Sequence, residues 1–153
     1  MAKEMSIEKH ITIGRDISTV FEYLKETKNQ DRFSVWNMKD PDMKKTYSGT
    51  DGTVGFVYTW DSKDKSVGAG SQEITRIAPE KMIEYEIRFS RPMKNTATAA
   101  FLVSKAGDQS TTVTWTFKSP AKFPMSLFSP ILKNMLGKQM QQSLENLKAI
   151  LEK

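Results

Sequence analysis

The last part of the chain carries the clearest hydrophobic pattern. Between residues 126 and 153, apolar side chains recur at three- and four-residue spacing, which indicates one face of a long amphipathic helix. That stripe consists of Leu132, Leu136, Met140, Leu144, Leu147 and Leu151. Ser126 or Ser129 is a candidate N-cap, and Pro130 suits the first turn. Such a helix needs a large apolar surface to pack against, and the rest of the chain must supply it.

Over most of the remaining chain, apolar and polar residues alternate with a period of two, which is typical of half-buried β-strands. The pattern predicts strands over residues 5–13, 44–48, 54–60, 67–77, 82–89, 96–103 and 110–117. Tight turns between consecutive strands favour an antiparallel meander. The strand over 67–77 opens with Gly68-Ala69-Gly70, which suits a bulge or bend where no side chain fits.

The segment between the first two predicted strands has helical spacing instead. It predicts a first short helix with Asp16 or Ser18 as its N-cap, then a second short helix or turn that carries Phe33 and Trp36. The apolar set of the first helix is Ile17, Val20, Phe21 and Leu24. The order of elements predicts an α+β fold, in a single domain over residues 1–153: a strand, two short helices, about six strands and one long helix.

Composition sets limits on function. The chain has 153 residues, of which 38% are hydrophobic and 27% charged, as in an ordinary globular protein. It has no cysteine, which excludes disulfides, thiolate metal sites and a cysteine nucleophile. The net charge is +5, with Lys and Arg spread among Asp and Glu, so we expect no nucleic-acid partner. No apolar run approaches the roughly 18 residues of a spanning helix, and the N-terminus has no apolar signal core. We expect a cytoplasmic protein without stable membrane insertion.

Catalytic motifs give little support for an enzyme. The sequence has no Gly-x-Ser-x-Gly elbow, no His/Cys/Asp metal cluster and no phosphate-binding glycine loop. His10, the only histidine, falls on the polar face of the first strand, which favours a surface position. We therefore predict no catalytic residue, metal or cofactor from motifs. Tyr58, Tyr85 and Gln139 are the candidates for proton transfer or carbonyl polarisation if the protein does chemistry.

Short motifs in a fixed order carry a resemblance to a known family. They are Ile11-Thr12-Ile13 with Val20-Phe21-Glu22-Tyr23-Leu24; Tyr47-Ser48-Gly49 with Gly52-Thr53-Val54-Gly55; Tyr58-Thr59-Trp60-Asp61 before Gly68-Ala69-Gly70; Ile74 and Pro79; Ile83-Glu84-Tyr85; Thr112-Val113-Thr114-Trp115; and Leu144-Glu145-Asn146-Leu147-Lys148. Over nearly the whole chain this order resembles the SRPBCC superfamily of START-like, helix-grip proteins, and within it the polyketide cyclase/dehydrase-like group.

The resemblance implies a curved antiparallel sheet of about six to seven strands wrapped around the C-terminal helix, with a deep apolar cavity between them. Family members bind lipids, sterols, polyketides or plant hormones; some are cyclases and some are co-chaperones. Where the common pattern has a second tryptophan ahead of the one at Trp36, this chain has Phe33, which changes the shape of one cavity wall.

The strand faces and the helix stripe hold more aromatic bulk than a core requires. Given the resemblance, we predict that they line a cavity for a small hydrophobic ligand, such as a lipid, a polyketide or another aromatic or isoprenoid-like molecule; the alternative is that they fill the core. The predicted ligand-binding residues are Phe33, Trp36, Tyr58, Trp60, Tyr85, Ile87, Phe89, Phe101, Trp115, Phe117, Leu132, Met135, Leu136, Gln139, Met140 and Ser143. Gln139 and Ser143 are polar, so each either hydrogen-bonds a ligand or lies at the edge of the stripe.

Three functions follow from this site. The first is a non-catalytic module, monomer or homodimer, that encloses a small hydrophobic molecule. The second is an aromatase/cyclase-like dehydratase that uses the same cavity, and the third is a co-chaperone-type protein-interaction module. An apolar closed pocket favours the first, several inward polar groups near one spot favour the second, and a filled core favours the third.

Overall fold

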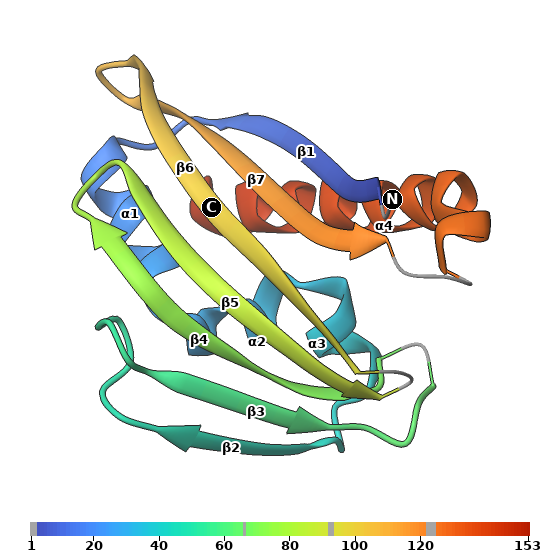
Figure 1. The fold of residues 1–153 in the computed structure, drawn as a ribbon. Helices are drawn as coiled ribbons and strands as arrows, with labels where there is room; N and C mark the ends of the chain where they lie inside the picture. The colour runs from blue at the N-terminus through green and yellow to red at the C-terminus, as the bar shows by residue number, and fades with distance from the viewer. Residues whose placement is uncertain (1–2, 66, 92–93, 122–124) are drawn as a thin grey trace.

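The computed structural model describes residues 3–65, 67–91, 94–121 and 125–153, with side chains for all of these except 3, 4, 120, 121, 125–129 and 132. The strands are β1 (Lys3–Ile13), β2 (Lys44–Ser48), β3 (Val57–Asp61), β4 (Ala69–Ala78), β5 (Met82–Arg91), β6 (Asn95–Gly107) and β7 (Ser110–Ala121). They form one antiparallel sheet in the order β1-β7-β6-β5-β4-β3-β2 (Figure 1). Strands β2 to β7 are a meander, and β1 returns to pair with β7, which confirms the predicted sheet.

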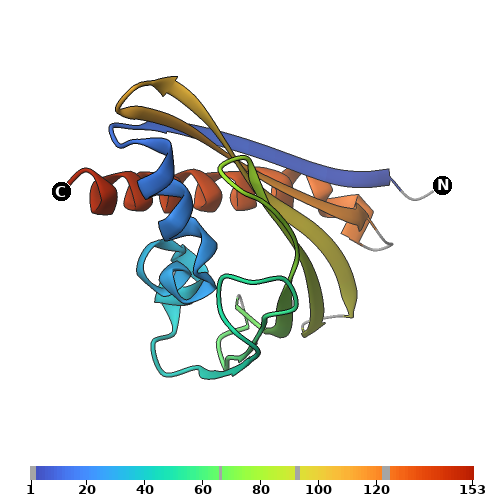
Figure 2. The same ribbon diagram turned by 90° about the vertical axis from the view of Figure 1, so that its left-hand side faces the viewer.

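The helices lie on the concave side of this curved sheet (Figure 2). They are α1 (Ile17–Lys25), the 3-10 turn η1 (Thr27–Asn29), α2 (Gln30–Phe33), α3 (Val35–Lys39) and α4 (Met125–Leu151). Asp16 is the N-cap of α1, and its Oδ2 accepts a hydrogen bond from the Thr19 amide at 3.2 Å, as the sequence predicted. The long helix α4 runs beside β1 and contacts α2 and α3.

Several boundaries differ from prediction, three of them for a reason that the structure shows. The strand predicted over 54–60 starts only at Val57, because Gly52 and Gly55 adopt positive φ and turn the chain, leaving Val54 59% exposed. Helix α4 already begins at Met125, so Ser126 and Ser129 lie within it and the N-cap prediction is wrong; Pro130 lies inside the helix too. The predicted second short helix is divided into α2 and α3, because the residue between them has an extended backbone.

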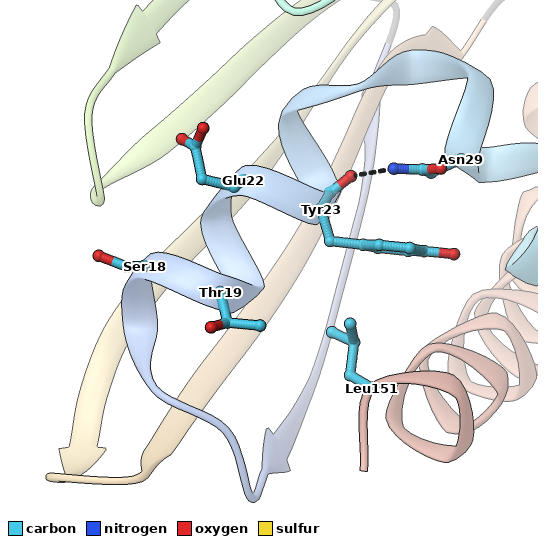
Figure 3. A pocket seen from close by; sticks show the side chains of 6 residues that line it. All are labelled: Ser18, Thr19, Glu22, Tyr23, Asn29 and Leu151. Atoms are coloured by element: carbon cyan, nitrogen blue, oxygen red, sulfur yellow. Dashed lines mark hydrogen bonds between the residues drawn. The ribbon is translucent and has the colours of Figure 1, made fainter. Parts of the chain in front are cut away.

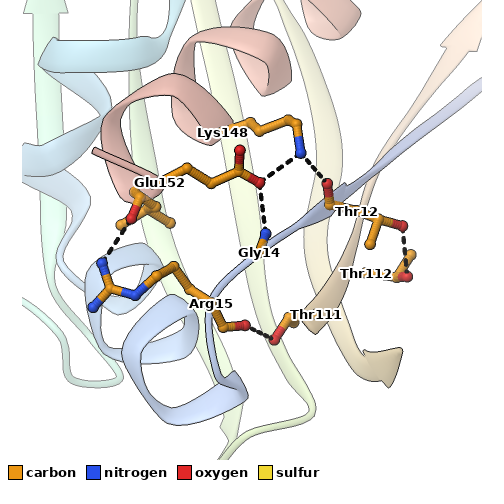
Figure 4. Close-up of polar contacts among 8 residues, drawn as sticks. Thr12, Gly14, Arg15, Thr111, Thr112, Lys148 and Glu152 are labelled. Atoms are coloured by element: carbon orange, nitrogen blue, oxygen red, sulfur yellow. Dashed lines mark hydrogen bonds and ion pairs between the residues drawn. The ribbon is translucent and has the colours of Figure 1, made fainter. Parts of the chain in front are cut away.

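Polar contacts fasten the end of α4 to the connection between β1 and α1 (Figure 4). The Glu152 carboxylate accepts hydrogen bonds from the Gly14 amide at 2.6 Å and from Lys148 Nζ, which also donates to the Thr12 carbonyl. The Arg15 guanidinium donates to the Leu151 carbonyl at 2.7 Å, which satisfies one of the free carbonyls at the helix end. These bonds fix the position at which the helix crosses the sheet.

This fastening predicts a pH-dependent stability. The Lys148 ammonium and the Gly14 amide hold the pKa of Glu152 below its ordinary value of 4.5. Because the pKa is lower in the folded protein, the stabilisation is present above the ordinary pKa and is lost as the pH falls through the lowered value. We expect Glu152→Gln to lower the Tm at pH 7, and the difference from wild type to shrink below pH 4.5.

The measurement is thermal unfolding of both proteins over a pH series. Glu145→Gln is the matched control, since Glu145 is exposed on the same helix and its carboxylate contacts only the Gln141 side chain among the described residues. At pH 7 this control should lower the Tm less than Glu152→Gln does, because it removes the acceptor of one long hydrogen bond of 3.3 Å. A Glu152→Gln difference that stays constant into the acid range would contradict the prediction.

Candidate functional site

The exposure of inward-facing side chains changes from one end of the concave face to the other. At the end near α1, Ile74, Ile83, Val113, Leu144 and Leu147 are 0% exposed, so no water-sized space adjoins them. Towards the other end, Met5, Ile7 and Met140 are buried, but six inward apolar residues around them and along the sheet are only partly buried although they pack on the core. We call these six residues the open-end set: Trp36, Trp60, Phe89, Trp115, Phe117 and Leu136.

Aromatic contacts organise the open end into two groups. On one side, Trp60 stacks on Tyr58 with ring centroids 5.9 Å apart and meets Phe89 edge-on at 6.0 Å. On the other side, the Trp115 ring stacks on Phe101 at 4.9 Å and meets Trp36 edge-on at 6.1 Å. Such ring pairs hold one another in fixed orientations. The two groups therefore present aromatic surface from β3 and β5 on one side, and from β7 and α3 on the other.

Small residues lie between the two aromatic groups. Ala97 and Ala99 of β6 face inward, opposite Ile87 and Tyr85 of β5. On β4, Gly70 pairs with Trp60, and a Cβ at Gly70 would lie 2.9 Å from Trp60 Cη2. The register of β4 against β5 shifts beside this glycine, which confirms the bend predicted for Gly68-Ala69-Gly70.

Four polar side chains from α2, β3, β4 and β5 form the interior polar cluster: Gln30, Tyr58, Gln72 and Tyr85. Three of them are nearly inaccessible, with exposures of 6% for Gln30, 5% for Tyr58 and 1% for Tyr85. Within the part of the chain that the structure describes, neither tyrosine hydroxyl has a hydrogen-bond partner of standard geometry, and the Gln72 amide reaches Gln30 Oε1 only at 3.4 Å. The cluster therefore holds hydrogen-bonding capacity that the described side chains do not use.

Burial raises the pKa of both tyrosine hydroxyls, and the Asp31 carboxylate adds to the rise at Tyr58. Gln30 lies close enough to Tyr85 to oppose the rise, although no hydrogen bond of standard geometry joins them. Both hydroxyls are therefore protonated at neutral pH and are available as donors.

The two predicted polar residues of α4 have different roles. Ser143 is 0% exposed, accepts a hydrogen bond from the Val35 amide at 3.0 Å and donates to the Gln139 carbonyl at 2.8 Å. Its hydroxyl is thus engaged within the protein, where it attaches α3 to α4 and so positions Trp36. Gln139 is half-buried, and its side-chain oxygen has no partner among the described residues.

The remaining predicted residues lie in several places. Phe33 is 1% exposed in the closed part of the core, and Ile87 is 9% exposed. Met140 is buried with Met5 and Ile7 of β1, whereas 50% of Met135 is exposed. The side chain of Leu132 lies outside the described residues. The structure thus brings most of the predicted aromatic residues to one face. Met135, which was also predicted to bind the ligand, is exposed instead.

Gln30 and Gln72 were not among the predicted site residues. A signal for Gln72 was present: it is two residues from buried Ile74 on β4, so a polar residue occupies the inward phase of the strand. Gln30 had no comparable signal, because the short helix α2 shows no apolar period from which its direction could be inferred.

Two surface hollows lie away from the predicted residues. One of about 500 Å³ lies between α1 and the end of α4 (Figure 3), and one of about 450 Å³ lies between β1 and α4. The first is lined by Ser18, Thr19, Glu22, Tyr23, Asn29 and Leu151, and the second by Ser6, Ile7, Glu8, Lys9, Pro130, Lys133, Asn134 and Gly137. Figure 3 shows the Tyr23 ring beside Leu151, with Ser18 and Glu22 directed away from it.

Within the described ranges, no three histidine, aspartate or glutamate side chains gather closely enough to hold a metal ion. None of the helices in that part of the chain has the length and apolar character needed to cross a bilayer.

The model of a family described as "Polyketide cyclase / dehydrase and lipid transport" matches residues 4–152. The chain belongs to this family. The resemblance found in the sequence is therefore confirmed for the polyketide cyclase/dehydrase family. No curated protein matches the chain.

Several solved structures share the fold. Norcoclaurine synthase from Thalictrum flavum, in complex with dopamine and hydroxybenzaldehyde, has a TM-score of 0.74 at 11% identity, covering 99% of this chain and 88% of that one. The Aha1 dimer from Colwellia psychrerythraea has a TM-score of 0.64 at 16% identity, with 96% of each chain covered. DynU16, a putative protein in the dynemicin biosynthetic locus, has a TM-score of 0.66 at 14% identity, covering 97% of this chain and 47% of that one. At these identities the likeness confirms the helix-grip fold.

Proposed function

We propose that the protein binds a small hydrophobic molecule at the open end of the concave face, between the two aromatic groups. The observation that carries this proposal is the partial burial of the open-end set. These inward-facing rings and Leu136 pack against the core on one side and keep accessible surface on the other. Covering apolar surface is favourable by about 25 cal/mol for each Å² removed from water, so a planar apolar guest would be stabilised there.

Comparison with relatives supports the proposal. The family is described by polyketide cyclisation and lipid transport. The norcoclaurine synthase structure contains dopamine and hydroxybenzaldehyde, which are both aromatic. The proposed site is built from residues of one chain, so it does not depend on whether the protein is a monomer or a homodimer.

The three tryptophans of the chain, Trp36, Trp60 and Trp115, all belong to the open-end set, so intrinsic fluorescence can report binding. The test is titration with N-phenyl-1-naphthylamine, a neutral apolar fluorophore. We expect saturable binding to wild type and at least about fivefold weaker binding to Phe89→Ala, because the guest loses one aromatic wall.

The matched control is Leu102→Ala, which removes an apolar side chain that is 38% exposed on β6. This variant should bind the fluorophore as wild type does. No saturable binding to wild type, or equal weakening in the two variants, would overturn the proposal.

A polyketide cyclase/dehydratase-like enzyme that uses the same face is the second candidate. The protonated hydroxyls of Tyr58 and Tyr85 favour it, because inward neutral donors can polarise a carbonyl oxygen. The co-chaperone-type alternative has only the shared fold of the Aha1 dimer in its favour.

A further inference from the structure

The interior polar cluster lies directly beside the proposed hydrophobic site. Tyr58 is opposite Gln72 across β3 and β4, and Tyr85 is opposite Ile74, the next inward residue of β4. The Tyr58 ring stacks on Trp60, a member of the open-end set. A guest that lies along Trp60 therefore has its inner end next to the cluster.

Among the described residues, the two tyrosine hydroxyls have no hydrogen-bond partner of standard geometry. Both belong to side chains that are at least nine-tenths buried, and Gln30, the polar side chain near Tyr85, makes no hydrogen bond of standard geometry with it within the described part of the chain. An unpaired buried hydroxyl costs free energy, and phenylalanine would fill the same space without that cost. Buried hydroxyls of Tyr23 and Thr27 also lack a partner among the described residues. What indicates a function in binding at Tyr58 and Tyr85 is their position in one cluster beside the open-end set.

Gln72 gives a route from the open end to these hydroxyls. It is half-buried, unlike the other three members of the cluster, and lies directly opposite Tyr58. Its hydrogen bond to Gln30 is long, at 3.4 Å, so little free energy is lost when a ligand takes the place of the Gln72 amide. The polar end of a guest can take the position of the Gln72 amide and reach Gln30 and both tyrosines.

The surrounding charges select a neutral group for that end. The members of the cluster are uncharged at neutral pH, and a buried ion without a partner is strongly unfavourable. The carboxylates of Asp31 and Asp51, which act on Tyr58 and Tyr85 respectively, would repel an anion. Neither is free for a cation, because Asp31 is paired with Lys45 at 3.1 Å and Asp51 accepts the amides of residues 27 and 28.

We propose that the guest carries a neutral oxygen acceptor, a ketone, quinone or ester carbonyl, at its inner end, and that Tyr58 and Tyr85 donate hydrogen bonds to it. This inference rests on the proposed function and adds the chemical class of the ligand. Hydroxyls that stay protonated suit a carbonyl acceptor better than a carboxylate or phosphate, which would need a cation.

The test uses 9-fluorenone and fluorene, which share one ring system and differ in a carbonyl group in place of a methylene. Quenching of tryptophan fluorescence measures both affinities. We expect wild type to bind fluorenone about tenfold more tightly than fluorene, the scale of one or two buried hydrogen bonds. Tyr58→Phe and Tyr85→Phe should each reduce that ratio, and the double variant should bring it close to one with the affinity for fluorene unchanged.

Tyr47→Phe is the matched control, because Tyr47 stacks on Tyr58 but is itself 40% exposed and should leave the ratio unchanged. Without ligand, Tyr58→Phe and Tyr85→Phe should keep or slightly raise the Tm, since the lost hydroxyl had no partner.

A clear fall in Tm would mean that the hydroxyls have a structural partner, and this would overturn the inference. Equal affinity for the two probes, or a ratio that both tyrosine variants preserve, would also overturn it while leaving the proposed function intact. Failure of both probes to bind wild type would reject the proposed function and this inference together.

Discussion

Replacement of Gly70 by alanine is expected to lower the free energy of unfolding by about 3 kcal/mol or more, the upper part of the range for overpacking a core. A Cβ at this position would lie 2.5 Å from the Arg88 carbonyl oxygen and 2.9 Å from Trp60 Cη2. The first contact is the more severe, because that oxygen belongs to the backbone of β5, which is hydrogen-bonded to strands on both sides and cannot easily move. The second contact would displace the Trp60 ring, so binding of N-phenyl-1-naphthylamine should weaken as well.

Urea denaturation of wild type and variant gives the change in stability. Gly107→Ala is the matched control in the same sheet, because its Cβ would meet only Ser110 Cβ at 3.4 Å, an ordinary contact distance. Its stability should change by less than about 1 kcal/mol. Equal losses of stability in the two variants would show that the close approach of Gly70 to the Arg88 carbonyl oxygen does not require a glycine there.

Regular periodicity explains which elements could be predicted from the sequence. The alternation of Ile83, Tyr85 and Ile87 placed these three side chains inward, and all three are buried. At the end of β6 and the start of β7 the pattern fails: residues 104–109 are exposed, yet the hairpin continues to Gly107 paired with Ser110. Exposed pairs are held by backbone hydrogen bonds that any side chain allows, so their extent leaves no apolar signal.

The division between α2 and α3 depends on contacts from far along the chain. Ser143 of α4 accepts the Val35 amide at the start of α3, and Asn146 donates to the Phe33 carbonyl at the end of α2. These side chains satisfy backbone groups that a helix boundary leaves free. Because the partners are more than 100 residues away, local sequence predicted one short helix or turn and could not locate the boundary.

The sequence predicted which side chains of the candidate site face inward, but not which of them lie in the closed end and which in the open end. Strand phase identified Tyr85 and Phe89 as inward neighbours on β5, yet the first is 1% exposed and the second is only partly buried. The difference arises from what packs on each ring: Tyr85 lies against Phe101 and close to Gln30 of α2, whereas Phe89 meets Trp60 at the open end. Such tertiary contacts are not visible in the strand pattern. The interior polar cluster depends on tertiary contacts too, since α2 brings Gln30 to Gln72.

A leucine-to-alanine substitution should therefore affect mainly stability in the second half of α4 and mainly ligand binding in the first half. Leu147 is 0% exposed in the closed end, so Leu147→Ala should cost about 2–5 kcal/mol of unfolding free energy through lost burial and a residual cavity. Leu136 belongs to the open-end set, where water or a guest can fill the space, and Leu136→Ala should cost only about 1 kcal/mol.

Binding of N-phenyl-1-naphthylamine, measured where both variants remain folded, should show the reverse order. Leu136→Ala should bind it at least about threefold more weakly, because the guest loses an aliphatic contact. Leu147→Ala should bind it as wild type does, because Leu147 is 0% exposed and belongs neither to the open-end set nor to the interior polar cluster. If Leu147→Ala weakened binding more than Leu136→Ala, the guest would have to lie in the closed end and displace the core there. The 0% exposure of Leu147 would then no longer identify a part of α4 that a ligand cannot reach. The helix could not be divided into a half that stabilises the fold and a half that binds the ligand.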